Sequence, residues 1–158
     1  MCSPNCWLTT GAVLAGLAVA AGAFAAHALD RHFYRVYAGQ IAEKRITIEG
    51  RETVVAQVPP AEKYLADFKT GAEYQMYHAL ALLAVGFLSQ TRASRTLTIA
   101  GFCFLAGCLG FSGGLYAYTL TGMKWIGQFV VPAGGLLFLA GWTAFAIAAC
   151  PCRRAGGR

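Results

Sequence analysis

Four long stretches of this sequence contain no charged side chain, and this pattern constrains the fold more than any other feature. The charge-free stretches are Cys2–Leu29, Tyr74–Thr91, Thr96–Met123 and Trp125–Cys152. An α-helix needs about 20 mostly apolar residues to cross a hydrocarbon core about 30 Å thick. Three of the stretches are long enough alone, and the second becomes long enough if its helix begins near Lys69. The sequence therefore predicts four transmembrane helices, at about residues 7–29, 70–90, 97–120 and 125–149.

Composition supports the same interpretation. Apolar residues make up 57% of the 158 residues, charged residues only 13%, and the mean hydropathy is +0.51. A soluble fold of this size exposes too much surface to bury so many apolar side chains. The same composition excludes a disordered chain. We therefore expect a lipid bilayer to be the solvent of this protein.

The connections between the later helices are short. Arg92 and Arg95 separate the second and third predicted helices, and Gly122, Lys124 and Gly127 mark the turn before the fourth. Short connections force neighbouring helices to run antiparallel. The fold class predicted is an all-α membrane protein: a four-helix transmembrane bundle, up-down-up-down, in which residues 1–158 form a single membrane domain. Four crossings place both termini on one side.

A cleaved signal peptide is the alternative interpretation of the first helix, because small residues from Ala18 to Ala28 offer a cleavage site. A signal peptide has a basic region before its apolar core, whereas no Lys or Arg precedes Trp7. We expect the first helix to be retained.

Residues 30–69 form the long extramembrane loop of this prediction. Residues 45–58 are rich in β-branched side chains and contain Gly50 centrally, which predicts a β-hairpin closed by Pro59 and Pro60. Residues 61–68 then resume a helical pattern. Two interpretations fit this loop: an element that docks a partner outside the bilayer, or a linker that carries a hairpin without a function of its own.

The net charge of +6 and the pI of about 9.2 raise the question of nucleic acid. The basic residues are scattered and form no stripe or recognition helix, so we expect no nucleic-acid partner. Five basic residues and no acidic one lie on the side of the termini, and eight basic residues lie on the other side. Long loops cross the membrane largely regardless of charge. We expect a multi-pass protein of the cell (inner) membrane with both termini in the cytoplasm.

Ionisable residues inside a membrane are costly and suggest function. His27, Glu73 and His78 are the three candidates. At about 1.5 Å per residue, His27 lies at the depth of Glu73 and Tyr74, and about 9 Å from the depth of His78. A hydrogen bond from His27 to Glu73 or Tyr74 is therefore expected, and a haem held by both histidines is disfavoured.

Polar residues also repeat at helical spacing. Tyr74, Gln75 and His78 share one helix face, and Ser112 and Tyr116 are one turn apart. These residues predict a polar seam that either relays protons or binds a small polar group, or else is a hydrogen-bond network that fixes helix register. Because no ionisable pair continues to the other side, a through-going relay is poorly supported.

Small residues repeat every four positions in the predicted helices, which favours close packing in lipid. Ala12, Gly16 and Ala20 repeat in the first helix. The glycines predicted to pack are Gly16, Gly22, Gly110, Gly114, Gly134 and Gly135. The pattern leaves open whether they join helices of one chain or of two.

Four cysteines near the termini could together hold zinc or an iron–sulfur cluster, namely Cys2, Cys6, Cys150 and Cys152. Their spacing matches no standard motif. We expect free thiols, no bound metal and no cofactor.

Four stretches resemble one known family. They are Gly22–Leu29 (GAFAAHAL), Tyr74–Leu83 (YQMYHALALL), Phe111–Tyr116 (FSGGLY) and Pro132–Gly135 (PAGG), the last followed by Gly141–Trp142. Together they are similar to the YgdD/YwdK-type small multi-pass membrane proteins, domain of unknown function 423. The resemblance implies a four-helix integral membrane protein and adds Tyr77 to the polar set. It names no substrate or reaction, it does not extend to Glu73, and it implies that the loop of residues 30–69 is an insertion.

The sequence contains no Ser-His-Asp set, phosphate loop or paired-carboxylate centre, so we expect no enzyme. The function predicted is a structural or assembly component of the membrane, which packs with other membrane proteins or with copies of itself. A small proton-linked or small-molecule transporter that uses the polar seam is the first alternative. A haem- or metal-binding redox protein is the second.

Overall fold

The computed structural model describes residues 4–39, 42–48, 50–92 and 94–150. The first helical rod consists of α1 (Pro4–Phe24), a π-helical turn η1 (Ala25–Leu29) and α2 (Asp30–Val36). The second is α3 (Pro60–Thr91). The third consists of α4 (Arg95–Gly107), η2 (Cys108–Ser112) and α5 (Gly113–Thr121), and the fourth of η3 (Ile126–Val130) and α6 (Val131–Ala149).

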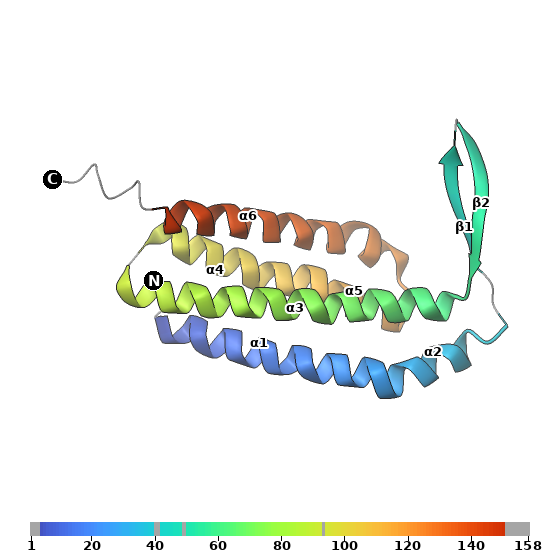
Figure 1. The fold of residues 1–158 in the computed structure, drawn as a ribbon, viewed down its shortest axis with the longest axis horizontal. Helices are drawn as coiled ribbons and strands as arrows, with labels where there is room; N and C mark the ends of the chain where they lie inside the picture. The colour runs from blue at the N-terminus through green and yellow to red at the C-terminus, as the bar shows by residue number, and fades with distance from the viewer. Residues whose placement is uncertain (1–3, 40–41, 49, 93, 151–158) are drawn as a thin grey trace.

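The four rods lie side by side, and consecutive rods run in opposite directions (Figure 1). The first rod begins, and α6 ends, at the same end of the bundle, which we call the terminus end. The opposite end, where the hairpin emerges, we call the loop end. This is the antiparallel packing that short connections impose.

Three helical rods in the described part of the chain are long and apolar enough to cross a membrane. They span Pro4–Val36, Arg95–Thr121 and Ile126–Ala149. The second rod, α3, is not among them: its first half carries charged residues, and its charge-free half, Tyr74–Thr91, contains polar residues such as Gln75 and His78 that lower its hydropathy. Length and composition alone therefore support three of the four predicted crossings.

The first and second helices extend beyond the predicted transmembrane spans into residues 30–69, at the second helix over the residues 61–68 that were predicted to be helical. The first helix continues to Val36, and α3 begins at Pro60. Proline is well suited to the first position of a helix, because it has no N–H that would remain unpaired there. The two extensions pack on each other, with the Phe33 and Tyr64 ring centres 6.1 Å apart. This contact buries apolar surface, although the sequence around it is rich in charged residues.

Two antiparallel strands lie between these extensions. They are β1 (Ala42–Ile48) and β2 (Arg51–Val58), paired from Ala42 with Val58 to Ile48 with Arg51. The pairing begins three residues before the predicted start at Arg45, and the register shifts between Lys44 and Arg45. Gly50 at the turn has φ +78°, a left-handed conformation that glycine adopts readily. The strand pair projects sideways from the loop end (Figure 1).

Buried apolar side chains form two clusters along the bundle. Trp7, Leu82, Phe104 and Phe138 belong to the larger cluster. Ala25, Leu29, Phe33, Ala61 and Phe68 form the cluster at the loop end.

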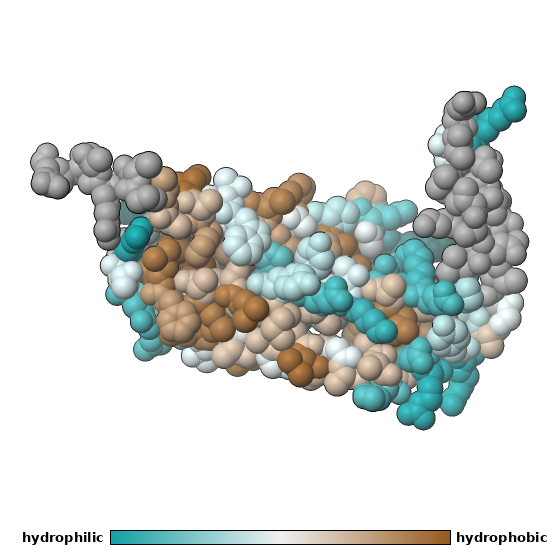
Figure 2. Space-filling model, viewed as in Figure 1, coloured by the Kyte–Doolittle hydropathy of each residue, from teal (hydrophilic) through white to brown (hydrophobic). Residues whose placement is uncertain are grey.

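Many large apolar side chains instead face outward, such as Leu109, Phe129 and Leu136, which are 69%, 70% and 67% exposed. Apolar residues cover much of the face in Figure 2, and hydrophilic residues gather at the loop end. An outward surface of this kind is typical of a protein surrounded by lipid.

Candidate functional site

Gln75 on α3 joins three helices. Its side chain is 6% exposed, and its Nε2 donates a hydrogen bond to the Leu14 carbonyl of α1 at 2.9 Å. Its Oε1 accepts a hydrogen bond from the Tyr116 hydroxyl of α5 at 3.1 Å. An amide side chain can donate and accept at once, so it can link two neighbours. The shared face predicted for α3 thus points into the bundle at this position.

His78 lies one turn further along α3 and joins α3 to α6. Its Nδ1 donates to the Tyr74 carbonyl at 2.7 Å, and its Nε2 accepts from Trp142 Nε1 at 3.2 Å. Because the indole N–H can only donate, Nε2 must be the unprotonated nitrogen. The imidazole also stacks on Phe138, with ring centres 3.4 Å apart and planes 6° apart. The ring is therefore held as a neutral tautomer with both nitrogens engaged.

Ser112 and Tyr116 reach the same interior from the third rod. Ser112 is completely buried, and its hydroxyl has no hydrogen-bond partner within the described chain. The Tyr116 ring packs on Phe68, with centres 4.5 Å apart. Gly71 makes room for this contact, because a methyl group there would lie 3.0 Å from the Tyr116 ring. We call Gln75, His78, Tyr116 and Trp142 the interhelical network.

The remaining members of the predicted seam lie outside this network. His27, Glu73, Tyr74 and Tyr77 are all exposed. Within the described residues, no hydrogen bond joins His27 to Glu73 or to Tyr74, so that expectation is corrected. Equal depth does not imply a shared face: Ala25 and Leu29 take the inward positions beside His27, and the Tyr74 ring packs on Phe111 at 4.8 Å.

Gly110, Gly114 and Gly134 lie where helices approach closely. A methyl group at Gly134 would collide with the backbone of Phe111 and lie 2.7 Å from the Gly110 carbonyl carbon. A methyl group at Gly114 would lie 3.0 Å from Val131. At Gly135 the nearest atom is 3.7 Å away, an ordinary contact. Backbones therefore meet directly where α6 crosses η2.

Two of the predicted packing glycines, Gly16 and Gly22, make no close contact within the chain. A methyl group at either would meet nothing within 4 Å. The inward stripe of α1 instead contains Trp7, Gly11 and Ala18, and a methyl group at Gly11 would lie 2.8 Å from the Ala79 carbonyl oxygen. The alternating spacing of four and three residues from Trp7 to Gly11, Leu14 and Ala18 was the sequence signal for this face.

Sequence reasoning also missed Trp142, although the residue belongs to a stretch that carried the resemblance. Trp142 is separated from His78 by 64 positions, and no local spacing connects them. The two rings meet only because α6 packs back along the bundle.

The described residues contain no group of three or more His, Cys, Asp or Glu side chains that could hold a metal ion. Cys6 and Cys150 are exposed free thiols. Cys2 and Cys152 lie outside the described residues, so the four-cysteine hypothesis remains a sequence-based one.

Comparison with known proteins identifies the family. The model of the family described as "Protein of unknown function (DUF423)" matches residues 21–135. The chain belongs to the DUF423 family. The matched residues include His78 and Tyr74, which share a hydrogen bond, and Gly110 and Gly134, whose backbones are in contact.

Curated relatives of this DUF423 protein are named as membrane proteins of the UPF0382 group. One from Staphylococcus aureus (strain bovine RF122 / ET3-1) is 35% identical over 142 residues, covering 90% of this chain and 93% of the relative. YwdK of Bacillus subtilis is 33% identical over 144 residues, covering 90% and 94%. A relative from Haemophilus influenzae is 35% identical and covers 90% and 91%. No solved structure matches the chain.

Proposed function

We propose that this DUF423 protein crosses the membrane four times and acts as a structural or assembly component without enzymatic activity. The observation that carries the proposal is the interhelical network. Its two buried members, Gln75 and His78, bond to Tyr116, to Trp142 and to backbone carbonyls, and tie α3 to α1, α5 and α6. Polar groups that are already paired stabilise helix packing and have little capacity left for a substrate.

The fourth crossing is α3, whose apolar character is the lowest of the four rods. It packs against α1, α4 and α5 along its length. Its charge-free part, Tyr74–Thr91, spans about 27 Å at about 1.5 Å per residue, close to the thickness of the hydrocarbon core. Its inward polar residues are paired with neighbours and shielded from lipid. A helix surrounded in this way can cross with fewer apolar residues than a lipid-facing one.

The proposed location is the cell (inner) membrane, with both termini in the cytoplasm. Support comes from the basic residues of the terminus end. Arg92 lies in the short turn after α3, and Arg95 is the first residue of α4. The Arg92 guanidinium donates to the Ala148 carbonyl at the end of α6 at 3.5 Å. Basic residues in short loops favour the cytoplasmic side.

Assembly with another membrane protein, or with a second copy, would use the outward face of α1. Ala12, Gly16 and Ala20 are exposed on this face and have the spacing that lets helices approach closely. This face is the place to test the proposal.

The test is photo-crosslinking in native membranes with a photoreactive amino acid in place of Gly16. The matched control carries it at Leu136, an outward position on α6 that is 67% exposed. We expect a discrete protein adduct from position 16 and only lipid adducts from position 136. Equal, non-specific labelling at both positions would contradict an assembly role.

A flux assay tests the transporter alternative separately. We expect proteoliposomes that contain the full-length protein to match empty vesicles in proton flux. Flux that the intact protein supports and His78→Ala abolishes would replace the structural proposal.

A further inference from the structure

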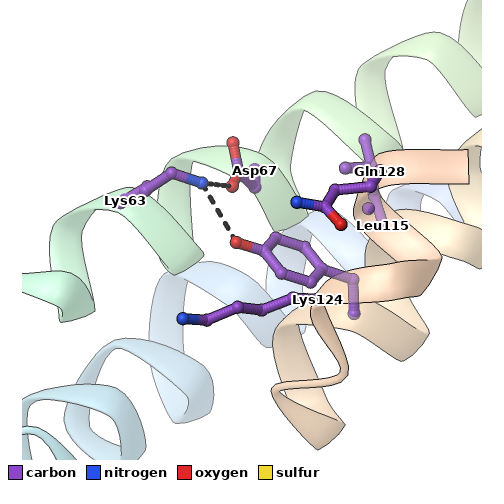
Figure 3. A pocket seen from close by; sticks show the side chains of 7 residues that line it. Lys63, Asp67, Leu115, Lys124 and Gln128 are labelled. Carbon is purple, nitrogen blue, oxygen red and sulfur yellow. Dashed lines mark hydrogen bonds and ion pairs between the residues drawn. The ribbon is translucent and has the colours of Figure 1, made fainter. Parts of the chain in front are cut away.

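A cavity of about 380 Å³ opens at the loop end, between α3, α5 and the first turns of the last rod (Figure 3). Its lining residues are Lys63, Asp67, Leu115, Tyr118, Lys124, Gly127 and Gln128. Lys63 and Asp67 come from α3, and the Gln128 amide points toward them from the opposite wall (Figure 3). This cavity is separate from the interhelical network.

The positive charge of Lys63 is balanced within the cavity by the carboxylate of Asp67. The Lys63 ammonium donates to Asp67 Oδ2 at 2.7 Å and to the Tyr118 hydroxyl at 3.1 Å. Burial lowers the pKa of Lys63, but its hydrogen bonds with Asp67 and Tyr118 outweigh burial, so the pKa is raised overall. Lys63 and Asp67 therefore form a neutral pair at neutral pH.

Lys124 is the second cation, and the described chain gives it no ion-pair or hydrogen-bond partner. With the Lys63–Asp67 pair neutral, Lys124 leaves the cavity with a net charge of +1. A single positive charge in a lined cavity attracts an anion of equal charge.

The position of Lys124 along the chain fixes its depth. It follows the tight turn at Gly122, where φ is +71°, between two rods that are each apolar enough to cross a membrane. Such a turn must lie at the membrane surface. Trp125, next in the chain, is 56% exposed, and exposed tryptophans favour the headgroup layer. The cavity therefore opens at the level of lipid phosphates.

We propose that this cavity binds the phosphodiester headgroup of an anionic membrane lipid, with the Lys124 ammonium and the Gln128 amide donating to the phosphate oxygens. An ammonium at the membrane surface is suited to such headgroups, because it donates charge-assisted hydrogen bonds to phosphate oxygens. The single negative charge of a phosphodiester matches the net charge of the cavity. Inorganic phosphate carries more negative charge at neutral pH than the single positive charge of the cavity compensates.

The test uses the full-length protein in a neutral detergent and three probes. These are dioctanoyl phosphatidylglycerol, dioctanoyl phosphatidylcholine and inorganic phosphate, each titrated while thermal unfolding is followed. We expect phosphatidylglycerol to raise the unfolding midpoint and the other two probes to leave it unchanged. Lys124→Gln should weaken the apparent affinity for phosphatidylglycerol about fivefold. Lys124→Arg should retain it, and the unliganded midpoints report whether each variant folds.

The matched control is Lys69→Gln, an exposed lysine of α3 that does not line the cavity. Equal stabilisation by the two lipids would overturn the proposal, as would equal losses for Lys124→Gln and Lys69→Gln. Saturable stabilisation by inorganic phosphate that depends on Lys124 would assign the cavity to a free anion and overturn the lipid assignment.

Discussion

Two surfaces of this DUF423 protein have the same small-residue repeat and opposite surroundings. Where α6 crosses η2, Gly134 lies against the backbone of Gly110. A methyl group at Gly134 would lie 2.7 Å from the Gly110 carbonyl carbon, and one at Gly110 would lie 3.2 Å from the Gly134 Cα. On α1, Gly16 is exposed, and a methyl group there would meet nothing within 4 Å. The repeat shows that two backbones can approach closely, and the side chains around it decide whether they do so within the chain.

The largest expected effect is at the packed surface. Gly134→Ala places a methyl group against the Gly110 and Phe111 backbone, which cannot move aside as a side chain can. We expect a loss of about 3 kcal/mol in the free energy of unfolding, at the upper range for overpacking. Denaturant titration of the purified protein in detergent measures it. Gly135→Ala, at the next position, should change the stability little, and equal losses for the two would show that the contact is not backbone to backbone.

The next effect compares two glycines of α1. Gly11→Ala brings a methyl group within 2.8 Å of the Ala79 carbonyl oxygen, so we expect a loss of about 2 kcal/mol. Gly16→Ala should leave folding unchanged or stabilise it by up to about 1 kcal/mol, because alanine favours helix more than glycine does. The same titration gives both values. If Gly16→Ala destabilised the protein more than Gly11→Ala, the inward face of α1 would be wrongly assigned.

Smaller effects come from the hydrogen bonds of the interhelical network. Gln75→Leu removes bonds to α1 and α5, and we expect a loss of about 1 kcal/mol, since such bonds within membranes average about 0.6 kcal/mol each. Tyr116→Phe removes one of the two and should cost about half as much.

The control for these variants is Tyr77→Phe, which removes a hydroxyl from a side chain that is 56% exposed. It should cause no measurable change in the unfolding titration. In the double variant Gln75→Leu/Tyr116→Phe the losses should be less than additive, because the two residues share one bond. Full additivity would contradict that shared bond.

Much of the helical architecture follows from the distribution of charge, because charged side chains mark where helices leave a bilayer. Charge alone misplaced the ends of the first two helices. The contact of Phe33 with Tyr64 extends both into a charged region, and aromatic packing between distant segments has no local signal. The helical pattern of residues 61–68 already indicated helix before Lys69, and α3 begins at Pro60.

The site was predicted only in part, because contacts between distant segments have no local signal in the sequence. Gln75 and His78 share a face on α3, and helical spacing was enough to place them together. The partner of His78 is Trp142 on α6, which only the folded chain brings near. His27 was assigned by depth, a property that does not specify which side of a helix a residue occupies.

The central claim is that α3 crosses the membrane between its neighbours. In a full-length variant whose native cysteines are replaced, single cysteines at Glu62 and Gln90 would be labelled with a membrane-impermeant maleimide. Both positions are exposed and lie near opposite ends of α3. The account predicts that intact spheroplasts label position 62 alone and that inverted vesicles label position 90 alone. Labelling of both positions from the same side would contradict it.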